Sequence, residues 1–199
     1  PGRAALTLPR TADNRGMDIP DDHEVIAATR HWLEAAVIGL NLCPFAKAVL
    51  QKEQIRFVVS AAADPEMLAR ELAVELQRLA DSDPEQLETT LLVHPRVLQD
   101  FDDYNDFLDV ADALLESLEL DGDLQVASFH PDYRFEGEDA DDVSNCSNRS
   151  PYPTLHLLRE DSIDRAVAAF PDAATVYEKN IETLRRLGWE GWRALFAPR

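Results

Sequence analysis

Apolar residues recur along this chain with two different periods, and the change from one period to the other outlines the expected elements. A spacing of three to four residues between Val25 and Val37 predicts a helix that opens at Asp21 or Asp22 and ends at Gly39. The turn that follows contains a proline suited to the first position of a second, short helix. The predicted fold therefore begins with a pair of helices.

An alternation of strands and helices follows this pair. Short runs rich in β-branched and aromatic residues predict strands, and longer stretches with helical periodicity predict helices. The predicted strands are Ile55–Ser60, Thr89–His94, Leu124–His130 and a fourth, Thr154–Leu158. The predicted helices are one that begins at Asp64 and then Asp106–Leu118, Asp161–Phe170, Ala173–Leu187 and Trp189–Phe196. Strands linked through helices are usually parallel neighbours, so we expect an α/β or α+β fold with a small, mainly parallel sheet covered by helices.

The chain is long enough for one ordinary core. Its 199 residues favour a single globular domain over residues 20–199, preceded by a mobile tail over residues 1–19, which lack apolar periodicity. Residues 131–151 carry a run of acidic side chains and no apolar period. A connection of this length predicts either a functional loop or a disordered one.

The charge and composition of the chain limit the classes of partner that it is expected to bind. With 38 acidic and 19 basic residues, the formal net charge is −19, so a nucleic-acid backbone or an anionic membrane would repel the chain. No apolar run reaches the about 18 residues of a membrane span, and residues 1–18 lack the apolar core expected of a secretory signal. Two cysteines fit a reducing compartment, which predicts a cytoplasmic location. Phosphate-loop, dinucleotide, serine-hydrolase and zincin motifs are absent from the sequence.

Two histidines follow predicted strands and precede prolines. His94 and His130 each stand at the carboxyl end of a strand, where ligands gather in open parallel sheets. Because proline keeps the preceding residue extended, each imidazole is expected at the mouth of one crevice, beside solvent. Both are therefore candidates for acid–base catalysis. The alternative is that each histidine merely caps its strand and binds loop carbonyls.

Cys43 is the candidate nucleophile. If Pro44 opens the short helix that runs to about Gln51, Cys43 becomes its N-cap and faces unpaired backbone N–H groups. Lys47 lies about one helical turn away and adds a cation. Both effects favour the thiolate, whereas the alternative is an ordinary buried cysteine.

Further polar residues suit an anion or a metal. Arg149 and Ser150 offer a fork and a hydroxyl for a carboxylate or phosphate, although Arg149 could simply pair with Asp141 or Asp142. Zinc binding is an alternative, although the residues that could act as ligands lack the short spacing of zinc motifs. These possible ligands are His94, His130, His156, Cys43 and the loop residue Cys146, a thiol expected to be exposed. His156, between leucines of the fourth strand, is more typical of a core residue.

Three segments resemble one family. They are Gly39–Ala46 (GLNLCPFA), Ser128–Phe135 (SFHPDYRF) and Asn148–Glu160 (NRSPYPTLHLLRE), and together they resemble the bacterial family catalogued as domain of unknown function 1415. The resemblance extends from about Glu24 to Ala194 and implies a small cytoplasmic protein without an assigned activity. The matching positions are Asn41, Cys43, Pro44, Phe45, Lys47, His130, Tyr133, Arg134, Asn148, Arg149, Ser150, Tyr152 and His156. Cys146 lies off these positions.

These observations favour a small cytoplasmic enzyme acting on an anionic small molecule. Cys43, His130 and His94 are its expected catalytic residues, and no cofactor is predicted. The expected substrate-binding residues are Arg149, Ser150, Asn41, Lys47, Tyr133, Arg134 and Tyr152. The rivals are a metal-binding protein and a non-catalytic interaction module. The latter is suggested by the aromatic C-terminal helix, which could form a homodimer or partner surface if it is exposed.

Overall fold

The structure is a computed structural model that describes residues 21–169 and 175–197. The predicted tail, residues 1–19, lies outside the described residues. None of the described helices is long and apolar enough to cross a membrane.

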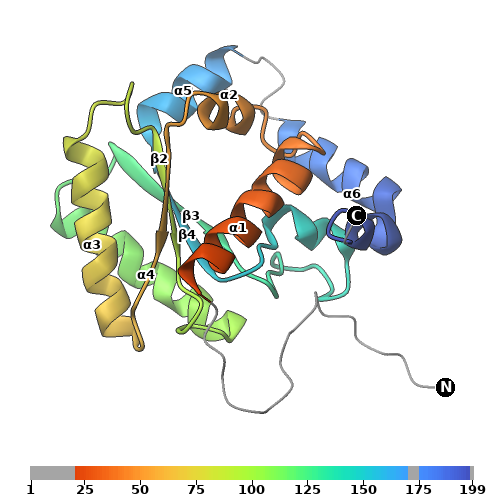
Figure 1. The fold of residues 1–199 in the computed structure, drawn as a ribbon, viewed down its shortest axis with the longest axis horizontal. Coiled ribbons are helices and arrows are strands. Elements are labelled where there is room, and N and C mark those ends of the chain that lie inside the picture. The colour runs from red at the N-terminus through yellow and green to blue at the C-terminus, as the bar shows by residue number, and fades with distance from the viewer. Residues whose placement is uncertain (1–20, 170–174, 198–199) are drawn as a thin grey trace.

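A four-stranded sheet divides the molecule into layers. Its strands are β1 (Ile55–Val59), β2 (Thr89–Val93), β3 (Leu124–Phe129) and β4 (Thr154–Arg159). The strand order is β1-β2-β4-β3. Helices α3 (Pro65–Asp81) and α4 (Phe101–Ser117) cover one face, and α1 (Asp22–Trp32) lies on the other (Figure 1).

The expected α/β architecture is confirmed, but the expectation of a mainly parallel sheet is wrong. β1 pairs with β2 in parallel, whereas β4 is antiparallel to both β2 and β3. The first three strands do run in one direction, as the helical crossovers predict. The long segment after β3 returns the chain so that β4 enters between β3 and β2. Its apolar side chains at Leu155 and Leu157 are fully buried there.

The N-terminal helix has the predicted limits but changes type. α1 continues as a π-helix, η1 (Leu33–Ile38), and the next residue is Gly39. A Cβ at Gly39 would lie 2.2 Å from the carbonyl oxygen of Ala35, so only glycine fits this tight approach. The short helix α2 (Ala46–Gln51) follows the turn.

The later helices correct one predicted start and confirm one predicted break. α4 begins at Phe101, five residues before the predicted start, because Asp100 accepts hydrogen bonds from the backbone of residues 102 and 103. α5 (Glu160–Ala169) leads to α6 (Val176–Ala194). The predicted break between two C-terminal helices is confirmed as a kink, since Gly188 takes a φ of 66° inside α6. The predicted ends at Phe170 and Ala173 lie outside the described residues.

Two apolar clusters pack on the opposite faces of the sheet. One joins the sheet to α3 and α4 and includes Leu92 and Tyr104. The other surrounds Trp32 and joins α1 to α6, and its buried members include Trp192 and Cys146. The predicted aromatic stripe of the C-terminal helix therefore contributes to the core, because Trp192 is only 1% exposed.

Candidate functional site

The two histidines after β2 and β3 do converge at one edge of the sheet. The rings of His94 and His130 lie 5.7 and 5.1 Å from the ring of Tyr104, which stands between them. The Tyr104 hydroxyl donates to Thr154 O and accepts from the backbone of Phe129, so its position is fixed. However, both imidazoles are fully buried, and the expectation that they lie beside solvent is wrong.

His130 uses both ring nitrogens to hold loops. The backbone N–H of Asp132 donates to Nδ1 at 3.0 Å, so Nε2 carries the proton and donates to Leu98 O at 3.3 Å. Leu98 takes a φ of 55°, and this bond helps to hold that unusual turn. Burial lowers the pKa of His130. The alternative interpretation, in which the histidine binds loop carbonyls, describes this residue.

His94 differs from His130 because only one of its two ring nitrogens has a hydrogen-bond partner in the part of the chain that the structure describes. Its Nδ1 contacts Val97 O at 3.0 Å, while its buried Nε2 has no hydrogen-bond partner among the described residues. Burial lowers the pKa of His94 to about 4, so the ring is neutral at pH 7. Its Nδ1 must then carry the hydrogen, and Nε2 is an unused acceptor.

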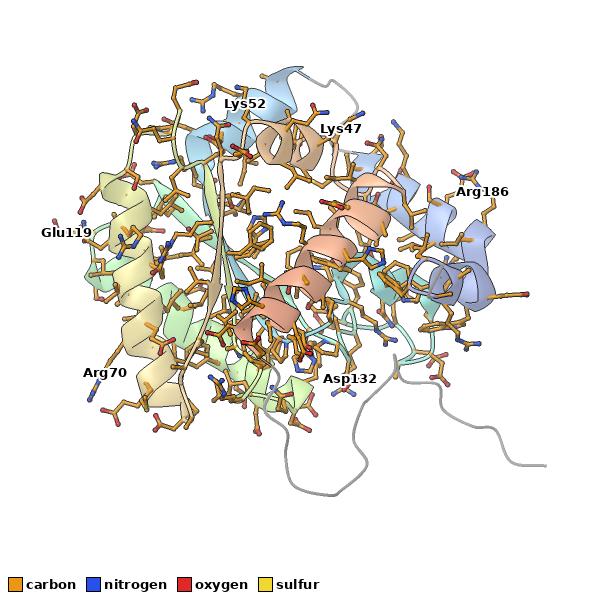
Figure 2. The ribbon with its side chains drawn as sticks, viewed as in Figure 1. Lys47, Lys52, Arg70, Glu119, Asp132 and Arg186 are labelled. Atoms are coloured by element: carbon orange, nitrogen blue, oxygen red, sulfur yellow. The ribbon has the colours of Figure 1, made fainter. Side chains whose placement is uncertain are left out.

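Cys43 does not have the environment that the sequence predicts. α2 begins at Ala46 with Phe45 as its N-cap, so neither Pro44 nor Cys43 takes its predicted place in the helix. The backbone of residues 42 and 43 instead turns back to Val37 O, which sets the turn before the helix starts. Cys43 is half-buried against the Trp32 cluster, and no hydrogen bond joins its sulfur to an imidazole in the described part of the chain. Lys47 is exposed on α2 (Figure 2).

Both residues of the expected anion clamp, Arg149 and Ser150, already donate hydrogen bonds to backbone carbonyls of the protein. Arg149 donates to Tyr133 O at 3.0 Å and to Ala140 O at 2.7 Å, so it binds neither Asp141 nor Asp142. Ser150 is fully buried and donates to Tyr152 O at 2.6 Å.

Two of the remaining predicted binding residues meet at one aromatic ring. Arg134 pairs with Asp102 and lies over the ring of Phe101, while Tyr133 packs edge-on against the same ring. Asn41 is exposed and takes a φ of 55° in the turn before Cys43. Tyr133, Arg134 and His130 therefore share contacts with the Phe101 ring, whereas no contact joins Asn41 to them in the described part of the chain.

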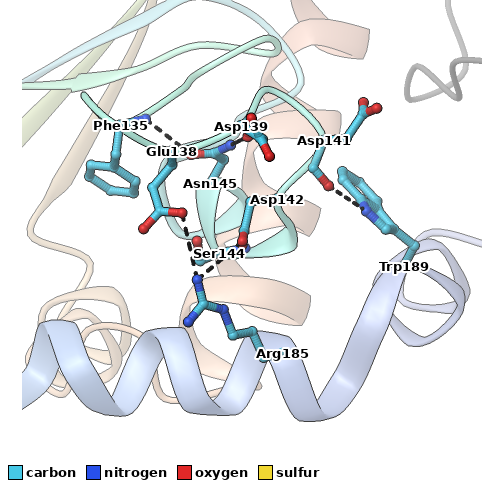
Figure 3. Close-up of polar contacts among 9 residues, drawn as sticks. All are labelled: Phe135, Glu138, Asp139, Asp141, Asp142, Ser144, Asn145, Arg185 and Trp189. Carbon is cyan, nitrogen blue, oxygen red and sulfur yellow. Dashed lines mark hydrogen bonds and ion pairs between the residues drawn. The ribbon is translucent and has the colours of Figure 1, made fainter.

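The acidic segment is ordered rather than open. Residues 143–148 form a 3-10 helix, η2 (Val143–Asn148), which packs against α6. Buried Asn145 accepts from the backbone of Phe135 and donates to Asp139 O (Figure 3). The Trp189 indole donates to Asp141 O. Cys146 is fully buried in η2, and burial raises its pKa to about 12, so the expectation of an exposed thiol is wrong.

The predicted metal ligands are not assembled. Among the described residues, no three His, Cys, Asp or Glu side chains gather closely enough to hold a metal ion. His94 and His130 meet at Tyr104, whereas His156 lies on the side of the sheet that faces α1, and Cys43 packs beside Trp32.

A different group of polar residues lies on the face of the sheet turned toward α1, here called the α1 face. The pairing of the strands places Phe57, Leu91 and His156 side by side on this face. The guanidinium of Arg30, from α1, lies over the Phe57 ring at 4.7 Å from its centroid. His156 packs on Phe129, which in turn contacts Trp32 of α1. His156 is only partly buried.

Hydrogen bonds fix the state of His156. The Thr89 hydroxyl donates its single hydrogen to Leu157 O at 2.6 Å, so it can only accept from His156 Nε2, which lies 2.8 Å away. Burial lowers the pKa of His156 to about 4, and the ring is neutral at pH 7. Its Nδ1 is therefore a bare acceptor. Nδ1 has no protein partner among the described residues, and it is not one of the fully buried unpartnered atoms.

Sequence comparison matches residues 24–194 with the family described as "Protein of unknown function (DUF1415)". The chain belongs to this family. The match covers both the α1 face and the carboxyl edge of the sheet. No curated protein and no solved structure is similar enough to the chain to match it. The family assigns no activity, so function must be inferred from the arrangement of residues.

Sequence reasoning missed Arg30 and Thr89. An exposed arginine on a helix is typical of a solvated surface, and nothing local distinguishes it. The alternation within the fourth strand does place Thr154, His156 and Leu158 on one face, which was the available signal. The partner of His156 comes from β2, and only the observed β2–β4 pairing reveals it.

Proposed function

We propose that this chain is a small enzyme that binds an anionic small molecule on the α1 face, between Arg30 and His156. The observation that carries the proposal is the environment of Arg30. In a chain of net charge −19, its guanidinium rests on an aromatic ring and has no carboxylate partner among the described residues.

Other arginines at the sheet are already satisfied. Arg56 binds Glu75 through two hydrogen bonds, and Arg159 donates to the carbonyls of residues 79, 82 and 87. Stacking on Phe57 orients Arg30 but does not neutralise it, because a ring face contributes only about 0.5–1 kcal/mol at an exposed site. An anionic ligand would supply the missing countercharge. A fork of donors suits a carboxylate or phosphate.

His156 supplies the chemistry in this proposal. Its neutral ring offers Nδ1 as a proton acceptor, and Thr89 holds the opposite nitrogen. A negative charge bound nearby favours the protonated imidazole, so an anion on Arg30 would raise the basicity of Nδ1 toward the neutral range. That change would make His156 a more effective acid–base group in the complex than in the free protein.

Cys43 remains a candidate on the same side of the sheet. It packs against the cluster that also includes Phe57 and Phe129. Its role as a nucleophile stays a prediction. The helix cap that motivated this prediction is not formed. The thiol is nevertheless a useful reporter, since Cys146, the other cysteine, is fully buried.

Calorimetric titration with inorganic phosphate and with two- to six-carbon carboxylates tests the proposal. We expect one of these anions to bind, and Arg30→Gln to weaken its binding about tenfold or more, as the loss of a charged hydrogen bond implies. Arg186→Gln is the matched control, because Arg186 is exposed on α6 (Figure 2). Iodoacetamide labelling of Cys43 should slow when the anion is bound. Absence of binding, or equal losses in both variants, would overturn the proposal.

A further inference from the structure

We infer that the ligand of the α1 face carries a hydrogen-bond donor, a hydroxyl or an amine, in addition to its anionic group. This inference rests on the proposed function and specifies its substrate class. It follows from which atoms of the site can donate and which can only accept.

The first step is the direction of the hydrogen bonds at Thr89. Thr89 is buried, and its hydroxyl hydrogen is used by Leu157 O at 2.6 Å. The hydroxyl oxygen lies 2.8 Å from His156 Nε2 and must accept from it. The protein therefore imposes the Nε2–H tautomer of His156, and Nδ1 presents a lone pair.

The second step is what a bare Nδ1 demands of a ligand. A carboxylate oxygen or a fully ionised phosphate placed there would oppose one lone pair with another. A hydroxyl or an ammonium hydrogen would instead be accepted. Burying this nitrogen under a ligand without a donor would leave it unsatisfied, which disfavours such a ligand.

The third step is the distance over which the two demands apply. Phe57, on which Arg30 rests, and His156 belong to strands separated by β2, so their backbones lie on the order of 10 Å apart. Arg30 requires the acceptor-rich end of the ligand, and His156 requires the donor. A carboxylate that also carries a hydroxyl or an amine meets both requirements.

The binding test uses three probes of one length that differ in a single substituent: malate with a hydroxyl, aspartate with an ammonium, and succinate with neither. We expect malate or aspartate to bind about five- to tenfold more tightly than succinate, the range for one additional hydrogen bond. The preferred probe identifies the donor. His156→Phe should remove the preference, so that the three probes bind about equally tightly.

Thr89→Val and Thr90→Val form a matched pair in case His156→Phe does not fold. Thr89→Val removes the group that orients the imidazole and should reduce the preference between probes. Thr90 also lies in β2, but its buried hydroxyl has no partner in the described part of the chain, so Thr90→Val should preserve the preference. ¹⁵N NMR of the imidazole gives an independent readout, because malate or aspartate should shift Nδ1 and succinate should not.

The outcomes separate the two proposals. Equal affinity for the three probes, with Arg30→Gln still weakening all of them, would overturn the donor requirement and leave the anion site in place. A protonated Nδ1 in the free protein at pH 7 would also overturn it. If none of the three probes nor the other anions bind, the proposed function fails and this inference fails with it.

Discussion

Arg185 of α6 donates to the carboxylate of Asp142, with 3.1 Å between Nη2 and Oδ2, and its guanidinium also lies 3.6 Å from Glu138 (Figure 3). This contact ties the acidic segment to the C-terminal helix across 43 positions of sequence. Hydrogen bonding from Ser144 lowers the pKa of Asp142, and Arg185 adds to the effect. The carboxylate therefore remains charged at neutral pH, where it can hold the helix.

Arg185→Gln should loosen the acidic segment without unfolding the protein. Because the pair is partly exposed, we expect a global loss of at most about 1 kcal/mol. Backbone hydrogen exchange over residues 136–142 should become faster, because local opening depends on this contact. Mass spectrometry of the exchanged peptides measures the change. Arg186→Gln, at the next residue, should leave these rates unaltered; equal acceleration in both variants would contradict the assignment.

Asn145 organises the same segment from within. It is fully buried, accepts from Phe135 N at 3.0 Å and donates to Asp139 O at 2.9 Å. Asn145→Ala should lower the free energy of unfolding by about 2 kcal/mol, because the backbone N–H of Phe135 and the carbonyl of Asp139 both lose their partner. Urea denaturation tests this value. Asn105→Ala, exposed on α4, should change stability little, and a similarly small effect at Asn145 would show that water replaces the amide.

The strands were predictable because each is a short local run. All four were located from composition to within a residue or two, since buried strands of five or six residues require such runs. The order of the strands was not predictable. The local sequence pattern does not determine which strands β4 pairs with. Its antiparallel insertion between β2 and β3 depends on packing by Leu155 and Leu157.

The candidate site was predicted less well, for a similar reason. The convergence of His94 and His130 followed from strand ends and was found. Their burial was not predicted, because Tyr104 covers them from α4, a helix predicted to begin after it. The start of α2 depends on bonds back to Val37, which no helix-capping rule contains. Short motifs therefore predicted where the candidate residues lie in the fold better than they predicted the burial and neighbours of those residues.

Arg56 and Glu75 form an ion pair whose two members differ in burial. The side chain of Glu75 is 7% exposed and that of Arg56 is 38% exposed. Arg56→Ala should cost about 1–3 kcal/mol, because the buried carboxylate would keep only Arg78, at 3.5 Å. Thermal and chemical denaturation measure the loss. Arg70→Ala breaks the fully exposed Arg70–Glu66 pair and should stay within about 0.5 kcal/mol.

A second variant separates charge burial from packing in this pair. Replacing both residues, as Arg56→Met with Glu75→Leu, should recover most of the stability lost in Arg56→Ala, since no uncompensated carboxylate remains. If the double variant is as unstable as the single one, the loss arises from missing contacts of the long arginine side chain instead.

Stability should fall as the pH is lowered from about 6.5 to 4, because burial lowers the pKa of both His94 and His156 to about 4. In this window the unfolded chain binds more protons than the folded chain does, so unfolding becomes more favourable as the pH falls. Each imidazole changes the free energy of unfolding by up to about 1.4 kcal/mol per pH unit, or by about 3 kcal/mol across the window.

Urea denaturation at pH 7, 6 and 5 measures the slope of this free energy against pH. His94→Asn keeps a donor near Val97 O but cannot titrate, and it should reduce the slope, to which His156 still contributes. His23→Gln, exposed on α1, should leave the slope unchanged. Identical slopes in the wild type and His94→Asn would mean that the buried ring is protonated in the folded protein, contrary to the environment described above.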